Sequence, residues 1–151
     1  MKKIILISLV SIAIIISLIL TFTNNKFSLE DKYYNNGKII QISGEEYNTL
    51  IKEKESFIVF VHLPGVCLFN LPFAPIVEEY VSTTNITIYS LNFKDIDNTN
   101  LEEKIQYSPS VVLIKKGKIN NYLDPNKESD LKYYKDITDF DNWINSYIKI
   151  K

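Results

Sequence analysis

One segment constrains the fold of this 151-residue chain more than any other, and it runs from Phe57 to Tyr80. Its first five residues, Phe57 to Val61, are all apolar and predict a buried strand. A loop rich in proline and glycine follows, and it leads to Cys67, the single cysteine of the chain. An amphipathic helix is predicted from Leu68 to about Ser82, with a kink at Pro75. A thiol at the start of a helix lies where the helix dipole favours its thiolate form.

The N-terminal residues indicate where the chain is located. Lys2 and Lys3 precede an uninterrupted run of nineteen residues from Ile4 to Phe22 that are apolar except for Ser and Thr. Such a run in helical form spans about 28 Å, close to one hydrocarbon core, and the basic N-terminus favours a cytoplasmic start. The competing interpretation is a cleaved signal peptide, whose apolar core is normally shorter and ends at small residues.

The first interpretation predicts a single-pass protein of the cell membrane with its folded domain on the extracytoplasmic side. The predicted parts are a cytoplasmic N-terminus (1–3), a transmembrane signal-anchor (4–22), a juxtamembrane tether (23–37) and one α/β domain (38–151).

Charge and cysteine content exclude several classes of protein. With Lys2 and Lys3 set apart, 15 basic groups stand against 18 acidic ones, a net charge of about −3. The basic residues are scattered in sequence, so nucleic acid is not expected as a partner. One cysteine in an exported domain permits no internal disulfide. An unpaired exported thiol is either used in chemistry or buried as a small, inert hydrophobe.

The order of predicted elements indicates the fold class. Strands are predicted at 38–42, 57–61, 86–91, 111–114 and 118–122, the last two joined by a Lys116-Gly117 hairpin turn. Ser43 and Glu46 form a capping box that opens a first helix, and Thr99 and Glu102 form a second that opens a short helix to about Ile105. A polar excursion covers 124–134, and a helix from about Ile137 to Ile148 closes the chain. Alternating strands and helices with a terminal antiparallel hairpin are typical of an α/β layered fold.

From about Lys38 to Lys149 the chain resembles the thioredoxin superfamily, whose fold is a central mixed sheet flanked by helices. The resemblance rests on features that occur in register: a buried strand leading to Cys67, Phe73-Ala74-Pro75 eight residues further on, Ser108-Pro109 before an apolar strand, a Lys115-Lys116-Gly117-Lys118 hairpin, and a closing helix with Trp143. It is closest in character to exported or membrane-tethered members of low-GC Gram-positive bacteria, some of which accompany bacteriocin or transport operons.

The resemblance implies site residues around the cysteine. If Cys67 occupies the position of the first family cysteine, the motif is Cys67-Leu68-Phe69-Asn70, in which the resolving cysteine is replaced by Asn70. In the alternative register Cys67 is the second family cysteine and Pro64 replaces the attacking thiol. In the first register Val61 stands where the family has a buried acid.

The segment Ser108-Pro109 is implied to be the substrate-binding cis-proline segment, lying beside Cys67. From the residues alone, Pro109 could equally be a proline that starts a strand. Leu68 and Phe69 are expected to form an apolar docking surface, and Asn70 could hydrogen-bond the thiolate.

His62, the single histidine, lies five residues before Cys67. A Cys-His pair is one interpretation, and a histidine turned away from the thiol by strand alternation is the other. One cysteine and one histidine do not make a metal site, and no cofactor is expected.

Two functions remain. The first is monothiol thiol-disulfide exchange or isomerisation by Cys67 on exported cysteine-containing proteins or peptides. The second is a redox-inactive binding module, an accessory subunit of a secretion or bacteriocin-maturation complex. The retained thiol and the Ser108-Pro109 segment favour the first, whereas Asn70 and Val61 favour the second.

Overall fold

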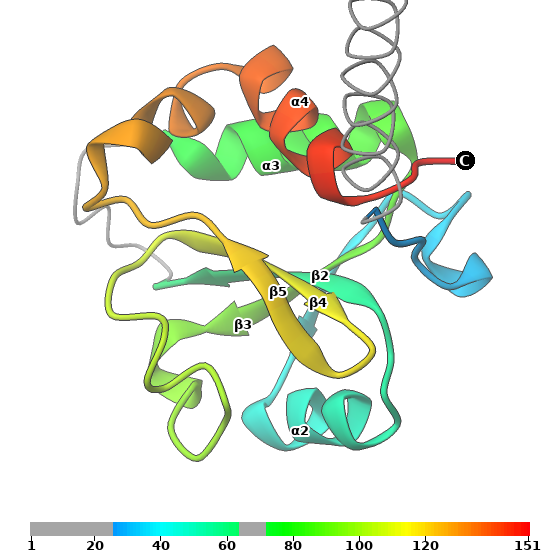
Figure 1. Cartoon of the computed structure of the whole chain (residues 1–151), viewed down its shortest axis with the longest axis vertical. Helices are drawn as coiled ribbons and strands as arrows, with labels where there is room; N and C mark the ends of the chain where they lie inside the picture. The colour runs from blue at the N-terminus through cyan, green and yellow to red at the C-terminus, as the bar shows by residue number, and fades with distance from the viewer. Residues whose placement is uncertain (1–25, 64–71) are drawn as a thin grey trace, which may run out of the picture.

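The computed structural model describes residues 26–63 and 72–151, and its centre is a five-stranded sheet (Figure 1). The strands stand in the order β1-β3-β2-β4-β5. Their bounds are β1 (Ile39–Ile42), β2 (Phe57–His62), β3 (Ile88–Asn92), β4 (Ser110–Lys115) and β5 (Lys118–Tyr122). The first three strands are mutually parallel, whereas β4 runs antiparallel to β2, and β5 antiparallel to β4. The predicted parallel core with a terminal antiparallel hairpin is therefore confirmed.

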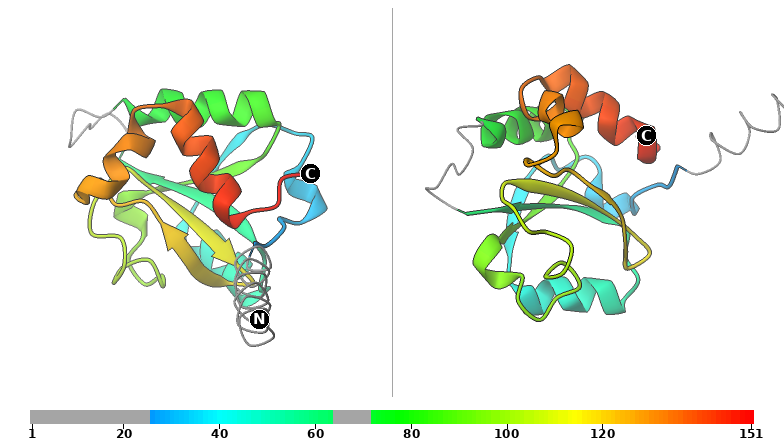
Figure 2. Two further views of the ribbon diagram at one scale, coloured as in Figure 1. Left: turned by 45° about the horizontal axis from the view of Figure 1, so that its top comes forward. Right: turned by 60° about the vertical axis from the view of Figure 1, so that its left-hand side comes forward.

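Helices cover both faces of the sheet, so the domain has three layers (Figure 1). The helices are α2 (Gly44–Lys52), α3 (Phe73–Thr84) and α4 (Ile137–Tyr147). The 3-10 helix η1 (Asp31–Tyr33) precedes them, and η2 (Phe93–Asp95) and η3 (Glu128–Tyr134) lie between α3 and α4 in the chain. Figure 2 shows α3 and α4 together on one face and α2 on the other. Side-chain contacts agree, because Phe60 packs edge-on against Phe73 of α3, while Phe57 packs against Tyr47 of α2.

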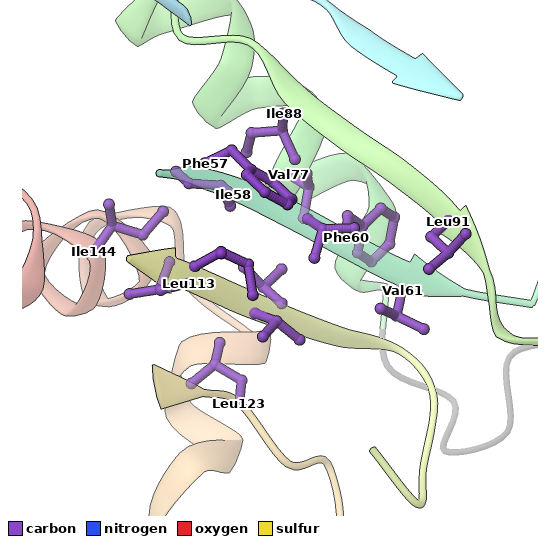
Figure 3. Packing of buried hydrophobic residues seen from close by; sticks show 14 of the residues in the cluster. Phe57, Ile58, Phe60, Val61, Val77, Ile88, Leu91, Leu113, Leu123 and Ile144 are labelled. Atoms are coloured by element: carbon purple, nitrogen blue, oxygen red, sulfur yellow. The ribbon is translucent and has the colours of Figure 1, made fainter. Parts of the chain in front are cut away.

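Strand β2 forms the middle of the hydrophobic core, as Figure 3 shows. Its first five residues are at most 3 % exposed. Alternation explains this, since Phe57, Val59 and Val61 face one helical layer while Ile58 and Phe60 face the other. A strand covered on both faces needs a continuous apolar run, and 57–61 is such a run.

Two local signals in the sequence are confirmed as predicted. Ser43 Oγ accepts a hydrogen bond from Glu46 N at 3.2 Å, and Glu46 Oε2 accepts one from Ser43 N at 2.7 Å, which completes the capping box of α2. Lys116 and Gly117 join β4 to β5 with φ angles of 51° and 71°. Two positive φ angles are the geometry of the tight hairpin turn. A Cβ on Gly117 would lie 2.4 Å from Ile51 O, so only glycine fits.

The helix predicted from Leu68 to Ser82 is corrected at both ends. Helix α3 begins at Phe73, after a non-helical Pro72 with ψ 59°, and continues to Thr84. Pro75 therefore lies in the first turn, where a missing N–H costs no helical hydrogen bond. The predicted kink was wrong because no described helical turn precedes it.

The short helix predicted from Thr99 was also wrong, because residues 97–104 form turns with a bend at Thr99. Thr99 Oγ1 donates to Ile96 O at 2.6 Å and accepts from Leu101 N at 3.1 Å. Glu102 Oε2 accepts from Asn98 N at 3.0 Å. These hydrogen bonds pair backbone groups with nearby side chains and compete with the backbone hydrogen bonds of a helix. The sequence pattern that can cap a helix therefore stabilises a turn here.

Residues 26–37 belong to the folded domain, which begins earlier than the predicted boundary at Lys38. Phe27, Leu29 and Tyr33 are at most 7 % exposed within the core. Phe27 pairs with the residues after α4: its N donates to Tyr147 O at 2.9 Å, and its O accepts from Lys149 N at 2.7 Å. The segment expected to be a polar tether is therefore held on the domain from Phe27 onward, and we name it the N-terminal arm (26–37).

A buried carboxylate fixes this arm to the start of β2. Glu55, 7 % exposed, accepts hydrogen bonds from Lys32 Nζ and Tyr33 Oη. Burial, together with the bond to Glu55, raises the pKa of Tyr33 well above its ordinary value, so its hydroxyl stays protonated and donates. A buried carboxylate is tolerated because it has both a charged and a neutral donor.

Within residues 26–63 and 72–151, no helix is long and apolar enough to cross a bilayer. The predicted anchor, Ile4 to Phe22, lies outside the described residues.

The arm predicts a stability effect at Leu29, a residue that the sequence placed in a tether. Leu29→Ala should lower the free energy of unfolding by about 2–5 kcal/mol, because it leaves a cavity in the core. The matched control is Ser28→Ala, an exposed neighbour expected to change it by less than about 0.5 kcal/mol. Urea unfolding of the two variants measures both changes in the free energy of unfolding. Equal midpoints would show that the arm is not part of the fold.

Candidate functional site

The candidate site lies at one end of the sheet, where β2 ends, α3 begins and β4 begins. The described residues around it are His62 and Leu63, Pro72 and Phe73, and the segment from Tyr107 to Ser110. Four residues predicted for the site from sequence, namely Cys67, Leu68, Phe69 and Asn70, lie outside the described residues. The structure therefore describes the residues that precede and follow the predicted thiol segment in the sequence.

Ser108 joins the segment before β4 to the end of β2. Its Oγ accepts a hydrogen bond from Leu63 N at 3.1 Å, and Ser108 is 1 % exposed. The Ser108–Pro109 peptide bond is cis, which confirms that part of what the resemblance implied, whereas the expected place beside Cys67 involves a residue outside the described ones. Leu63 is four residues before Cys67 in the sequence, so Ser108 lies beside the residue from which the chain continues toward Cys67.

Val61 occupies the position where the resemblance places a buried acid, and it is fully buried. It pairs with Leu91 of β3 on one side and with Ser110 of β4 on the other. An apolar side chain there cannot accept or donate a proton. Any chemistry at the site therefore proceeds without a buried carboxylate at this position.

His62 is half-buried on the face of the sheet that α3 covers. Its ring stacks on Phe60 with centroids 4.6 Å apart and an angle of 6°. Its Nε2 lies 2.8 Å from Ser90 Oγ, and Ser90 Oγ donates to Gln41 Oε1 at 3.3 Å. Because the hydroxyl proton of Ser90 is directed at Gln41, Nε2 is the donor to Ser90. Burial lowers the pKa of His62 below its usual value, which favours the neutral ring.

Ser90 and Gln41 were not anticipated from the sequence. They meet His62 because β1, β3 and β2 are neighbours in a parallel sheet in which Gln41 is in register with Ser90, and Ser90 with Phe60. A polar serine and glutamine within strands are a signal that something polar faces them. The signal becomes specific only once the strand register is known.

Comparison with known proteins gives information on the fold. No protein-family model matches the sequence, and no curated protein matches it. Solved structures do match. A mutant thioredoxin from Halobacterium salinarum superposes with a TM-score of 0.55 at 13% identity, over 78% of this chain and 96% of that one.

Two further thioredoxins superpose over most of their length. Oxidised thioredoxin O1 from Arabidopsis thaliana gives a TM-score of 0.52 at 16% identity, with coverage of 74% and 98%. Oxidised mitochondrial thioredoxin 3 from Saccharomyces cerevisiae gives 0.50 at 14% identity, with coverage of 71% and 93%. At such identities the similarity concerns the fold.

The environment of His62 predicts its titration. The single histidine should titrate with a midpoint below about 6.5, because burial favours the neutral ring. The unfolded chain then binds this proton more readily than the folded one, so stability falls as the pH drops below about 6.5. An NMR titration of the one imidazole measures the midpoint, and a value at or above 6.5 would contradict this environment. His62→Gln should remove its share of the pH dependence of unfolding.

Proposed function

We propose that this chain, which has a thioredoxin-like fold, acts by thiol-disulfide exchange through the single thiol of Cys67 on exported cysteine-containing proteins or peptides. In this proposal the protein is anchored in the cell membrane by residues 4–22, with its domain on the extracytoplasmic side. Asn70 stands at the resolving position and hydrogen-bonds the thiolate. Ser108 and Pro109, with Leu68 and Phe69, contact the substrate.

The proposed exchange begins with the thiolate of Cys67. The Cys67 thiolate attacks one sulfur of a substrate disulfide, so a Cys67–substrate disulfide forms, and the other sulfur leaves as a thiolate that takes up a proton. The freed substrate thiolate then attacks another disulfide of the same substrate, and the thiolate released from that disulfide attacks the mixed disulfide and releases Cys67. No net electrons are transferred, so the outcome is isomerisation. Two-electron reduction is not proposed, because position 70 supplies no second thiol.

The observation that supports this proposal most is the hydrogen bond between Leu63 N and Ser108 Oγ at 3.1 Å. It holds the segment before β4 against the end of β2, from which the chain continues to Cys67. A substrate engaged by the Ser108-Pro109 segment is thereby brought to the part of the chain that carries the thiol. Holding two reacting groups close together raises their effective concentration, and this contributes strongly to the rate of a reaction between them.

A redox-inactive binding module is the second candidate, and Val61 is the observation that favours it. This residue is fully buried where the resemblance places an acid, and Asn70 replaces the second thiol. Under this alternative the same end of the sheet binds a partner in a secretion or maturation complex without covalent chemistry. The reactivity of Cys67 separates the two functions.

We expect Cys67 to react with iodoacetamide in the folded protein near neutral pH, with a rate–pH midpoint below about 8.5, the value of a free thiol. Mass spectrometry of the full chain measures the rate, since no other cysteine contributes. The same chain in denaturant is the matched reference, and Cys67→Ser is the blank. Modification that occurs only after unfolding would identify a core thiol and leave the binding module as the function.

The anchor gives a separate expectation about topology. Protease added to intact cells should digest the domain while the undigested chain fractionates with the membrane. A cytoplasmic protein expressed in the same cells is the control for lysis. Quantitative appearance of a processed domain in the medium would show that the N-terminal segment is a cleaved signal peptide.

A further inference from the structure

The two edge strands of the sheet, β1 and β5, differ in their residues and in their pairing. Strand β5 carries Lys118, Asn120 and Asn121, and its register against β4 shifts. Charged residues and irregular pairing keep a sheet edge from pairing with another chain. Strand β1 reads Ile-Ile-Gln-Ile, pairs regularly with β3, and leaves Ile39 and Ile40 37 % and 38 % exposed. Of the two edges, β1 is therefore the one suited to pair with a further strand.

Two residues of β1 direct their backbone groups away from the sheet. Ile88 N donates to Lys38 O at 3.0 Å, so Lys38 faces β3. Successive residues of a strand direct their N–H and C=O groups to opposite edges, and therefore Ile39 and Gln41 face outward. The groups that β1 offers to a further strand thus lie symmetrically on either side of Ile40.

A groove of about 400 Å³ lies beside this edge, between β1 and α2. Besides Gln41, three residues of the strands and three of α2 line it: Ile40, Ile42, Tyr89, Glu46, Thr49 and Leu50. Gln41 Oε1 accepts a hydrogen bond from Ser90 Oγ at 3.3 Å on the opposite face of the sheet. A further strand at the edge would cover Ile40 and the apolar side of the groove, which favours association.

The charges along this edge differ between its two ends. Positions 37–44 carry one charged residue, Lys38, which is exposed and belongs to none of the ion pairs of the described residues. Helix α2, which follows β1, begins with Glu45 and Glu46, and both are exposed. The edge therefore starts with a positive charge and ends with negative ones.

The surrounding charges do not cancel this difference. Toward the start of β1 there are two ion pairs and the end of α2: Lys32 with Glu55, Lys151 with Asp31, and Lys52, Glu53 and Lys54. Toward its end the chain of η2 lies against Gly44, where a Cβ would come within 2.5 Å of Asp95 O. This segment adds Lys94, Asp95 and Asp97. The end of β1 thus stays acidic.

We propose that two copies of this chain associate through β1, as antiparallel neighbours about a two-fold axis at Ile40. In this register Ile39 of each copy pairs with Gln41 of the other, and Ile40 meets its own counterpart. Because both members of the Ile39–Gln41 pair face outward, they exchange both of their backbone hydrogen bonds. Every backbone group that β1 directs outward gains a partner, and the pair is closed. The association does not require Cys67 or its reactivity.

Charge complementarity favours a second copy over a peptide of another protein. The register places Lys38 of one copy opposite Ile42 of the other, on the face that α2 covers. Glu46 lines the groove together with Ile42, so each Lys38 approaches the Glu46 of the other copy. The two-fold axis brings these opposite charges together twice and keeps the two lysines apart.

Disulfide trapping in the full chain, purified in mild detergent with Cys67→Ser, tests the register. Ile40→Cys should cross-link under mild oxidation, since opposite Cα atoms of a non-hydrogen-bonded pair lie about 4.5 Å apart, within reach of a disulfide. Gln41→Cys, whose counterpart is displaced along the strand, and Asn120→Cys, exposed on β5, should cross-link severalfold more slowly. A rate for Ile40→Cys no higher than for either control overturns the proposal.

Charge substitutions test the contact between the copies. Lys38→Gln and Glu46→Gln should each slow the cross-linking of Ile40→Cys severalfold, and the two together should slow it little more than either one. Glutamine at position 46 preserves the capping box of α2. Lys52→Gln, an exposed change on α2 outside the groove, should have no effect. Independent, multiplying effects of the two changes would contradict the contact.

Amide hydrogen exchange tests the pairing without any change in β1. In the full chain with Cys67→Ser, the amides of Ile39 and Gln41 should exchange severalfold more slowly as the protein concentration rises. The amide of Ile40, which faces β3, should not respond, and neither should those of β5. Exchange at Ile39 and Gln41 that is independent of concentration, as expected of an edge reserved for another protein, overturns the proposal.

Discussion

The constraint on which the rest of the structure depends is the complete enclosure of β2. This strand is paired on both edges and covered on both faces, so its residues must be apolar and of the right size. Phe57 contacts α2, and Phe60 contacts α3, which fixes the two helical layers relative to the sheet. Only at the last residue, His62, does the strand become polar and half-buried. The candidate site begins where this enclosure ends.

The two ends of the sheet carry different groups, and this difference determines which end of the domain would face a substrate in the proposed function. At one end the Leu63–Ser108 hydrogen bond joins the end of β2 to the segment before β4. At the other end the N-terminal arm is held by Glu55 and by pairing of Phe27 with the residues after α4. Under the proposed membrane anchor, a domain attached through this arm would present the candidate site to the proposed exported substrates.

Local signals in the sequence predicted most of the fold, and long-range contacts explain the rest. The apolar run at 57–61, the Ser43 capping box and the Lys116-Gly117 turn act within a few residues, so sequence reasoning found them. Phe27 was assigned to a tether because its partner, Ile148, lies at the far end of the chain. The Thr99 pattern was ambiguous, since the same side-chain bonds that open a helix can close a turn. The contact of His62 with Ser90 depends on strand register, which spacing along the chain does not encode.

The central claim is that one thiol on this fold exchanges disulfides, and reactivation of a disulfide-scrambled protein tests it most directly. In a buffer without other thiols, the full chain reduced beforehand should restore activity to scrambled ribonuclease over many turnovers, since isomerisation returns Cys67 to its thiolate. Cys67→Ser should give only the background rate. Equal rates for the two proteins would contradict the exchange mechanism and leave partner binding as the function of this domain.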